Sequence, residues 1–133
     1  MDRLETLDTQ ECRALLASHS VGRVAFTEYA LPAIRPVNYT VHGTHIVLRT
    51  GADGLAARLD GQIVAFEIDE VDTAGRSGWS VVVTGSARVL RDEGELLRLD
   101  ADAPASWLGP DHTTAVWITP GQVTGRRISA SAA

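Results

Sequence analysis

Lysine is absent from this chain, and all twelve of its basic residues are arginine. Enzymes that form a Schiff base with a carbonyl compound need an amine side chain, so the absence of lysine excludes that chemistry. It also means that any bound phosphate must be held by arginine, by hydroxyl groups or by backbone amides.

Cysteine occurs only once, and long apolar runs and excess positive charge are missing. The single Cys12 excludes an internal disulfide and is typical of a reducing compartment. No apolar run approaches the ~20 residues that span a bilayer, and the first five residues lack the pattern of a secretory signal. The formal net charge of −5 argues against nucleic acid or an anionic membrane as a partner. We therefore expect a cytoplasmic protein.

The length and composition predict one globular domain. A chain of 133 residues is long enough to bury one core but not two. Its apolar fraction of 44% is ordinary for a globular protein. Residues 1–133 are therefore expected to form a single domain, with a frayed tail at 130–133.

Short strands at hairpin spacing dominate the rest of the pattern. Expected strands cover residues 21–27, 32–41, 44–50, 63–71, 79–90, 115–119 and 122–129, with a bulge at Gly85. Helices are expected only between strands: one capped by Asp8, with Glu11 completing a capping box, and others at 55–59 and 91–101. This count of six or seven strands predicts a mainly β protein, an antiparallel barrel with a few short helices.

The stretch from Arg35 to Thr50 carries the main candidate site. It predicts two strands that fold back on each other at His42-Gly43. Pro36 cannot donate to a ladder, so it belongs at a strand edge or a bulge, where backbone groups can face a ligand. Arg49 and Thr50 end the second strand just before a glycine-rich loop. A guanidinium, a hydroxyl and loop amides together suit a phosphate.

Other kinds of site find less support in the sequence. His42 and His45 flank a hairpin turn, but no third ligand lies at metal spacing, so we expect no metal site. The acidic residues at 69, 70 and 72 are explained by a solvated face. Neither a Gly-x-Ser-x-Gly turn nor a Cys/His pair at a known spacing indicates a hydrolase.

Five segments in a fixed order carry a family resemblance. They are R-P-V-N-Y, V-L-R-T, V-A-F-E-I-D-E-V-D, G-W-S-V-V-V-T-G and V-T-G-R-R-I, within residues 4–128. Together they resemble the FMN-binding split-barrel family related to pyridoxamine 5′-phosphate oxidase, and more closely its short actinobacterial, nitroimidazole-resistance-like branch. The resemblance implies a six-stranded antiparallel split barrel that forms a homodimer, with flavin in the clefts between subunits.

The resemblance also implies which residues hold the cofactor. The first strand of the candidate site lies along the flavin ring, the pair that ends the second strand reaches the ribityl phosphate, and the next helix follows. Trp79 and Ser80 approach from the partner subunit, although a tryptophan that opens a strand is equally typical of core or interface packing. The implied FMN-binding residues are Arg35, Pro36, Val37, Asn38, Arg49, Thr50, Leu55, Arg58, Trp79, Ser80 and Trp107. Trp107 is also explained as a hydrophobic plug.

The chain departs from the family at one point. Relatives commonly place a lysine just before the leucine that opens this helix, whereas here Gly54 precedes Leu55. Arg58 is a candidate substitute, and Asp53 repels a phosphate. Losing one charge-assisted contact weakens affinity by about ten- to a hundredfold.

Three functions therefore remain open. The leading one is an FMN-dependent oxidoreductase with an unknown small-molecule substrate and no identified catalytic acid or base. The others are a dimer that has lost flavin and serves a binding or structural role, and a reductase that uses the deazaflavin F420. Pyridoxamine-phosphate oxidation itself is not expected, because no second cluster of basic residues is present for a substrate phosphate.

Overall fold

A computed structural model of the chain describes residues 3–51, 54–91 and 114–130. These residues form seven strands and two short helices. In chain order they are β1 (Arg3–Leu7), α1 (Thr9–Ala17), β2 (Val21–Glu28), β3 (Leu31–His42), β4 (His45–Thr50), α2 (Leu55–Leu59), β5 (Ile63–Asp72), β6 (Ser77–Val89) and β7 (Thr114–Ser129). Neither helix has the length or apolar character needed to cross a membrane.

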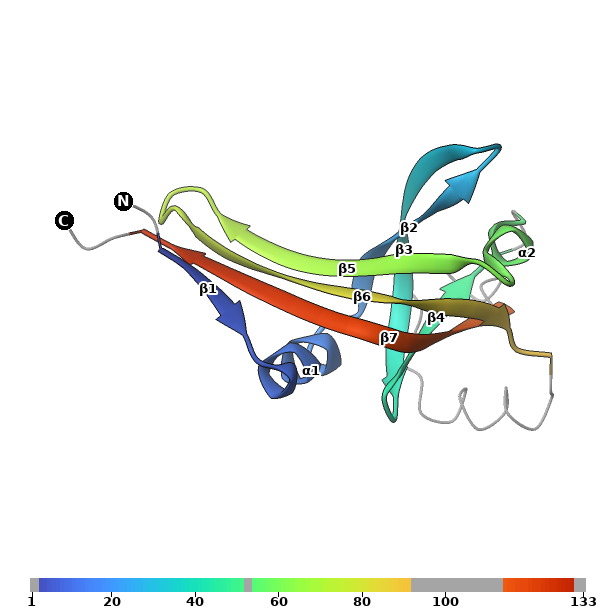
Figure 1. The fold of residues 1–133 in the computed structure, drawn as a ribbon, viewed down its shortest axis with the longest axis horizontal. Coiled ribbons are helices and arrows are strands. Elements are labelled where there is room, and N and C mark those ends of the chain that lie inside the picture. Colours follow the sequence, from blue (N-terminus) through green and yellow to red (C-terminus); the bar gives the residue numbers. More distant parts are fainter. Residues whose placement is uncertain (1–2, 52–53, 92–113, 131–133) are drawn as a thin grey trace.

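The strands form an antiparallel barrel, which confirms the predicted fold class. The sheet order is β1-β7-β4-β3-β2-β5-β6, and β7 also pairs with β6. Pairing therefore closes a ring of six strands, and β1 is added to β7 beyond the end of β4. Figure 1 shows β5, β6 and β7 along the length of the molecule, with β3 and β4 crossing them.

Alternating residues of the barrel strands build the core. Val24, Tyr39 and Phe66 are among its buried members, and burying a large apolar side chain contributes about 1.5–3 kcal/mol. Helix α1 adds Cys12 and Leu16 from the side. Its start is capped as predicted, because the Glu11 amide donates to the Asp8 carboxylate at 2.8 Å.

The structure corrects two expectations about strands. Residues 3–7 form β1, which the sequence does not predict because only Leu7 of this segment is buried. The two strands expected at the C-terminus are one continuous strand, β7, that runs through Pro120. Pro120 lies opposite Gly85, where the register between β6 and β7 shifts. The irregularity predicted at Gly85 is therefore present, but the additional residue is Gly121, so β7 is the bulged strand, and the bulge accommodates the proline. The expected helix at 91–101 lies almost wholly outside the described residues.

Candidate functional site

Asn38 and Arg49 form the centre of the candidate site. They are direct partners across β3 and β4, so their side chains extend from the same face of the sheet. Both are buried, although this is the outer face of the barrel, and Arg49 has interactions with the protein. Val47, Leu90 and Ala115 form a second small apolar cluster on the same face. The result is a buried arginine and a buried amide, side by side at a strand end.

Strand β3 has an open edge next to this pair. It pairs with β2 from Leu31 to Asn38, but within the described residues it pairs with β4 only from Asn38 onward. Residues 31–37 therefore have a strand neighbour on one side only. The sequence predicts an edge or bulge at Pro36, and the structure confirms the edge. Backbone groups at such an edge can bind a ligand.

The side chains of Arg35 and Val37 extend to the other face of β3. Val37 is part of the core, and Arg35 is half-buried and has interactions of its own. Pro36 is exposed on the outer face, and its cross-strand partner Arg23 extends from the same face. Of these three residues, only Pro36 shares the face of Asn38 and Arg49. Arg35 and Val37 can therefore meet a ligand on that face through backbone groups alone.

Thr50 ends β4 on the face opposite to Arg49, because consecutive strand residues alternate. Its side chain is buried, and its hydroxyl lies 3.5 Å from the carbonyl oxygen of Thr114. The chain then passes through Gly51 to Gly54, whose φ of 85° lies in the left-handed region. Leu55 opens α2 and is buried in the main core. Packing in the core alone accounts for the position of Leu55.

Arg58 is engaged elsewhere in the fold. Its guanidinium lies 3.2 Å from the carboxylate of Glu28 at the end of β2. Its carbonyl oxygen accepts a hydrogen bond from the side-chain amide of Gln62 at 2.7 Å. Reaching a phosphate would require Arg58 to leave Glu28, and such half-exposed ion pairs contribute about 0–1 kcal/mol.

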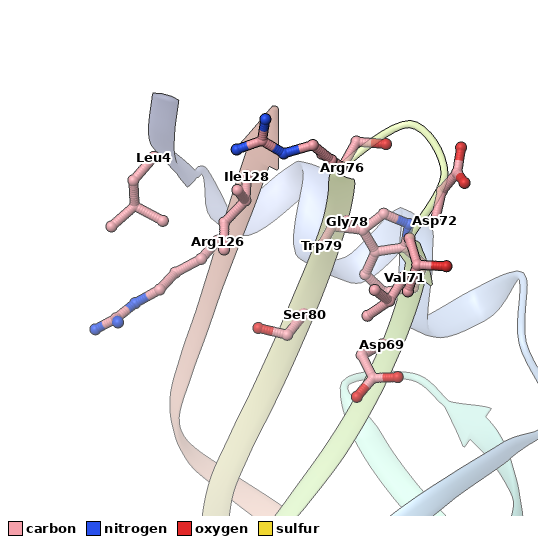
Figure 2. A pocket seen from close by; sticks show the side chains of 12 residues that line it. Leu4, Asp69, Val71, Asp72, Arg76, Gly78, Trp79, Ser80, Arg126 and Ile128 are labelled. Carbon is pink, nitrogen blue, oxygen red and sulfur yellow. The ribbon is translucent and has the colours of Figure 1, made fainter. Parts of the chain in front are cut away.

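Trp79 and Ser80 lie on opposite faces of β6, as Figure 2 shows. The Trp79 ring packs against the core and meets the His19 ring edge to face, with centroids 5.1 Å apart. Ser80 lies on the outer face, in register with Asp69 of β5 and Arg126 of β7. Trp79 and Ser80 therefore contribute to different surfaces of the barrel. The contacts of Trp79 agree with core packing, the alternative to cofactor contact that the sequence left open.

A pocket of about 570 Å³ opens on the outer face around Ser80 (Figure 2). It is lined by Leu4, Asp69, Val71, Asp72, Thr73, Arg76, Ser77, Gly78, Trp79, Ser80, Arg126 and Ile128. Its volume is in the range of ligand sites in proteins. The sequence reasoning missed Leu4, Val71 and Ile128 as members of a site, because their neighbourhood depends on the register of four strands.

An ion-pair cluster separates this pocket from Asn38 on the outer face. Arg23 of β2 lies 2.7 Å from Glu67 and 2.8 Å from Asp69. Burial raises the pKa of Glu67, and the hydrogen bond with Asp69 raises it further. Strands β3 and β6 are separated by three strand spacings, β3-β2-β5-β6, or about 14 Å at 4.8 Å each. The outer face therefore carries Asn38, Arg49 and Ser80, but the single chain does not bring Ser80 into contact with the other two.

The two remaining expectations about the site concern Trp107 and metal binding. Trp107 lies outside the described residues. Among the described residues, no group of three or more histidine, cysteine, aspartate or glutamate side chains is arranged to hold a metal ion.

Comparisons with known proteins place this geometry in a family context. The family model for pyridoxamine 5′-phosphate oxidase matches residues 8–127. The uncharacterized protein Rv0080 of Mycobacterium tuberculosis is 42% identical over 130 residues, covering 93% of this chain and 85% of that protein.

Two solved structures are similar along nearly their whole length. The FAD-binding protein from Mycobacterium smegmatis has 33% identity and a TM-score of 0.77, over 94% of this chain and 98% of that one. An FAD-binding protein from Mesorhizobium loti has 26% identity and a TM-score of 0.79, over 98% and 100%.

Proposed function

Because the chain belongs to the pyridoxamine 5′-phosphate oxidase family, we propose that it binds FMN in a cleft between two copies of itself and acts as an oxidoreductase. The observation that carries the proposal is the open edge of β3 beside the buried Asn38–Arg49 pair. Such an edge offers backbone donors and acceptors to a flat ring, and the arginine offers charge to the phosphate.

The residues present fit a flavin phosphate. Arg49 provides a planar cation with several donors, and Asn38 provides an amide that can donate and accept. In this proposal these two residues hold the ribityl-phosphate end, while the backbone of 35–37 lies along the ring. Thr50, whose side chain extends from the opposite face, contributes through its backbone at the strand end. Bound flavin supplies the transfer of electrons; the protein binds and orients it and excludes water from one of its faces.

A second copy of the chain completes the proposed cleft. Ile34 of β3 and Ile63 of β5 are exposed on the outer face, on either side of the paired Ala25 and Ala65. Exposed apolar side chains grouped in this way support association with another subunit. In the dimer, Ser80 of the partner would approach the ring on the side away from β3.

How well the chain can hold the flavin phosphate distinguishes the remaining candidate functions. The family lysine is absent, and Arg58 is held by Glu28 at 3.2 Å. This favours weak flavin binding over the tight binding expected of a full clamp, and it is the observation behind the second candidate, a dimer without a cofactor. The relatives from M. smegmatis and M. loti are FAD-binding proteins, so FAD belongs in the test beside FMN and F420.

Spectroscopic titration of the purified protein tests the proposal. FMN, FAD and F420 are added separately while their fluorescence is followed, and light scattering gives the mass of the protein with and without ligand. We expect FMN fluorescence to change saturably in a protein of twice the chain mass. Saturable binding of F420 alone would support the deazaflavin reductase. A dimer that binds none of the three compounds would support the cofactor-free function, and a monomer would remove the cleft.

A further inference from the structure

A cavity of about 150 Å³ lies between α1 and the barrel. It is bordered by α1, by the β3–β4 hairpin with its turn, and by β6 and the bulged part of β7. Figure 1 shows α1 and the hairpin turn on the same side of β7. Apolar cavities of this size hold molecules as large as benzene. The cavity is therefore large enough for one small ring.

The wall of the cavity is almost entirely apolar. Val83 of β6 is paired with Val123 of β7, and Val41 of β3 is paired with Ile46 of β4, so each pair extends from one face. Leu16 of α1 lines the cavity from the helix. All five side chains belong to the main core or pack against it. Water in this space would find few hydrogen-bonding partners, so an apolar group is the better occupant.

The bulge in β7 shapes one side of this wall. Pro120 and Val123 both line the cavity, although residues three apart in a regular strand extend from opposite faces. The additional residue Gly121 breaks the alternation between them and lets both side chains border the same space. The cavity is thus a consequence of the register shift between β6 and β7.

The mouth of the cavity carries one positive charge. Arg13 lies one turn before Leu16 and Ala17 on α1, and all three line the cavity. Arg13 is exposed and is the only charged residue among the described residues of the lining. In the described part of the chain it also forms no ion pair. Thr44, exposed at the hairpin turn, adds a hydroxyl to the lining. An anionic group at the mouth would therefore meet a cation without displacing a carboxylate.

We propose that this cavity binds a small aromatic carboxylate of the size of benzoate. The ring lies against Leu16, Ile46 and Val83, and the carboxylate lies at the mouth beside Arg13 and Thr44. A ligand in this position contacts both α1 and the β3–β4 hairpin, so it stabilises the folded chain. The site goes beyond the proposed function, because it lies on the inner side of the barrel and the proposed flavin site lies on the outer face.

Calorimetric titration with benzoate tests the proposal, with acetate and benzylammonium as matched probes. Benzoate should bind and should raise the midpoint of thermal unfolding. Acetate should bind about ten- to a hundredfold more weakly, because it lacks the ring that the cavity buries. Benzylammonium should bind at least about fivefold more weakly than benzoate, because it brings a positive charge to Arg13. Equal binding of benzoate and either probe, or no binding of benzoate, would overturn the proposal.

Two valines provide a matched pair of variants for the cavity. Val123→Phe should fill the space and abolish benzoate binding. Val71→Phe should leave binding unchanged, because Val71 is exposed on β5 and does not line the cavity. Circular dichroism checks the fold of both variants. Equal affinities in Val123→Phe and Val71→Phe would place the benzoate site elsewhere.

Two arginines test the mouth without disturbing the core. Arg13→Gln should weaken benzoate binding by about fivefold and bring benzoate and benzylammonium close to the same affinity. Arg126→Gln, at an exposed position on the outer face of β7, should leave both affinities unchanged. An equal loss in the two variants would contradict the assignment of the carboxylate to Arg13. None of these results depends on the flavin proposal, since a protein that binds no flavin can still bind benzoate in this cavity.

Discussion

Asn38 and Arg49 face each other across β3 and β4, and only 8% of Asn38 and 7% of Arg49 is exposed. A buried guanidinium is expensive to desolvate unless charged or polar groups compensate it. Stability alone does not require the arginine to be buried, since a surface arginine would serve stability equally well. The buried cation beside an open strand edge is therefore a specific feature of this barrel. It is the first position at which the flavin proposal can be tested.

Replacing Arg49 should separate cofactor binding from folding. We expect Arg49→Ala to weaken FMN binding by about ten- to a hundredfold or more, since it removes a charge-assisted contact to the phosphate. Arg49→Lys should retain part of the affinity as a point charge. Fluorescence titration measures both, and circular dichroism checks the fold. Arg13, exposed on α1, is the control: if Arg13→Ala weakens binding as much as Arg49→Ala, the phosphate site lies elsewhere.

Glu28 should limit the contribution of Arg58. The two side chains are 3.2 Å apart and partly exposed, so releasing Arg58 gains no more than about 1 kcal/mol, or about fivefold in affinity. Glu28→Gln should therefore tighten FMN binding by up to about fivefold, and the double variant Glu28→Gln/Arg58→Gln should lose the gain. Titration of both variants decides the matter, because a double variant that binds FMN as tightly as Glu28→Gln would exclude Arg58 from the site.

Local signals in the sequence predicted much of this arrangement. The Asp8 cap, the register shift at Gly85 and the strand edge at Pro36 each follow from the chemistry of one residue and its neighbours. The antiparallel barrel follows from the spacing of short strands. The hairpin itself was predicted, but its turn is Gly43-Thr44, one residue later than the expected His42-Gly43, and this register pairs Asn38 with Arg49.

Features that depend on distant register could not be predicted in the same way. β1 has no period-two pattern and exists because β7 extends beyond the end of β4. The grouping of Leu4, Ile128 and Val71 at the pocket on the outer face requires the register of four strands, which no local pattern gives. Trp79 and Ser80 were predicted as a pair, but strand alternation places their side chains on opposite faces.

Tyr39 should stabilise the junction between the barrel and α1. Its hydroxyl donates to the carbonyl oxygen of Leu16 at 2.6 Å, in the last turn of α1, where carbonyl groups lack helical donors. Burial raises the pKa of this hydroxyl, which therefore stays protonated. Tyr39→Phe leaves a buried acceptor without its donor and should lower the free energy of unfolding by about 1–3 kcal/mol. Urea denaturation measures it, with Tyr29→Phe, 87% exposed, as the control that should change nothing.

Gly125 should be required for the close approach of α1 to β7. A Cβ atom there would lie 2.5 Å from the Cys12 Sγ and 3.1 Å from the Leu7 side chain. We expect Gly125→Ala to destabilise the fold by about 1–3 kcal/mol through overpacking. In Gly121→Ala the added Cβ meets only the Thr84 carbonyl oxygen at 3.4 Å, so its stability should change little. Adding Cys12→Ala to Gly125→Ala should recover part of the loss, and strictly additive losses would show that the contact is not the cause.

His45 should make the stability of the β3–β4 hairpin depend on pH. Its ring lies 4.2 Å from the Trp117 ring, and burial lowers its pKa, helped by the charges of Arg88 and His42. The unfolded chain, with the ordinary pKa of 6.5, then binds a proton more readily than the folded chain. This contribution is constant above the ordinary pKa, and stability falls as the pH decreases from there toward the lowered pKa.

The difference in stability between the wild type and His45→Gln isolates this slope from those of other groups. Urea denaturation between about pH 5 and pH 8 should show the wild type losing stability on acidification relative to the variant. Arg88→Gln should reduce the slope without abolishing it, because burial remains the larger cause. Curves for wild type and His45→Gln that run parallel across this range would mean that His45 protonates as easily in the folded chain as in the unfolded one.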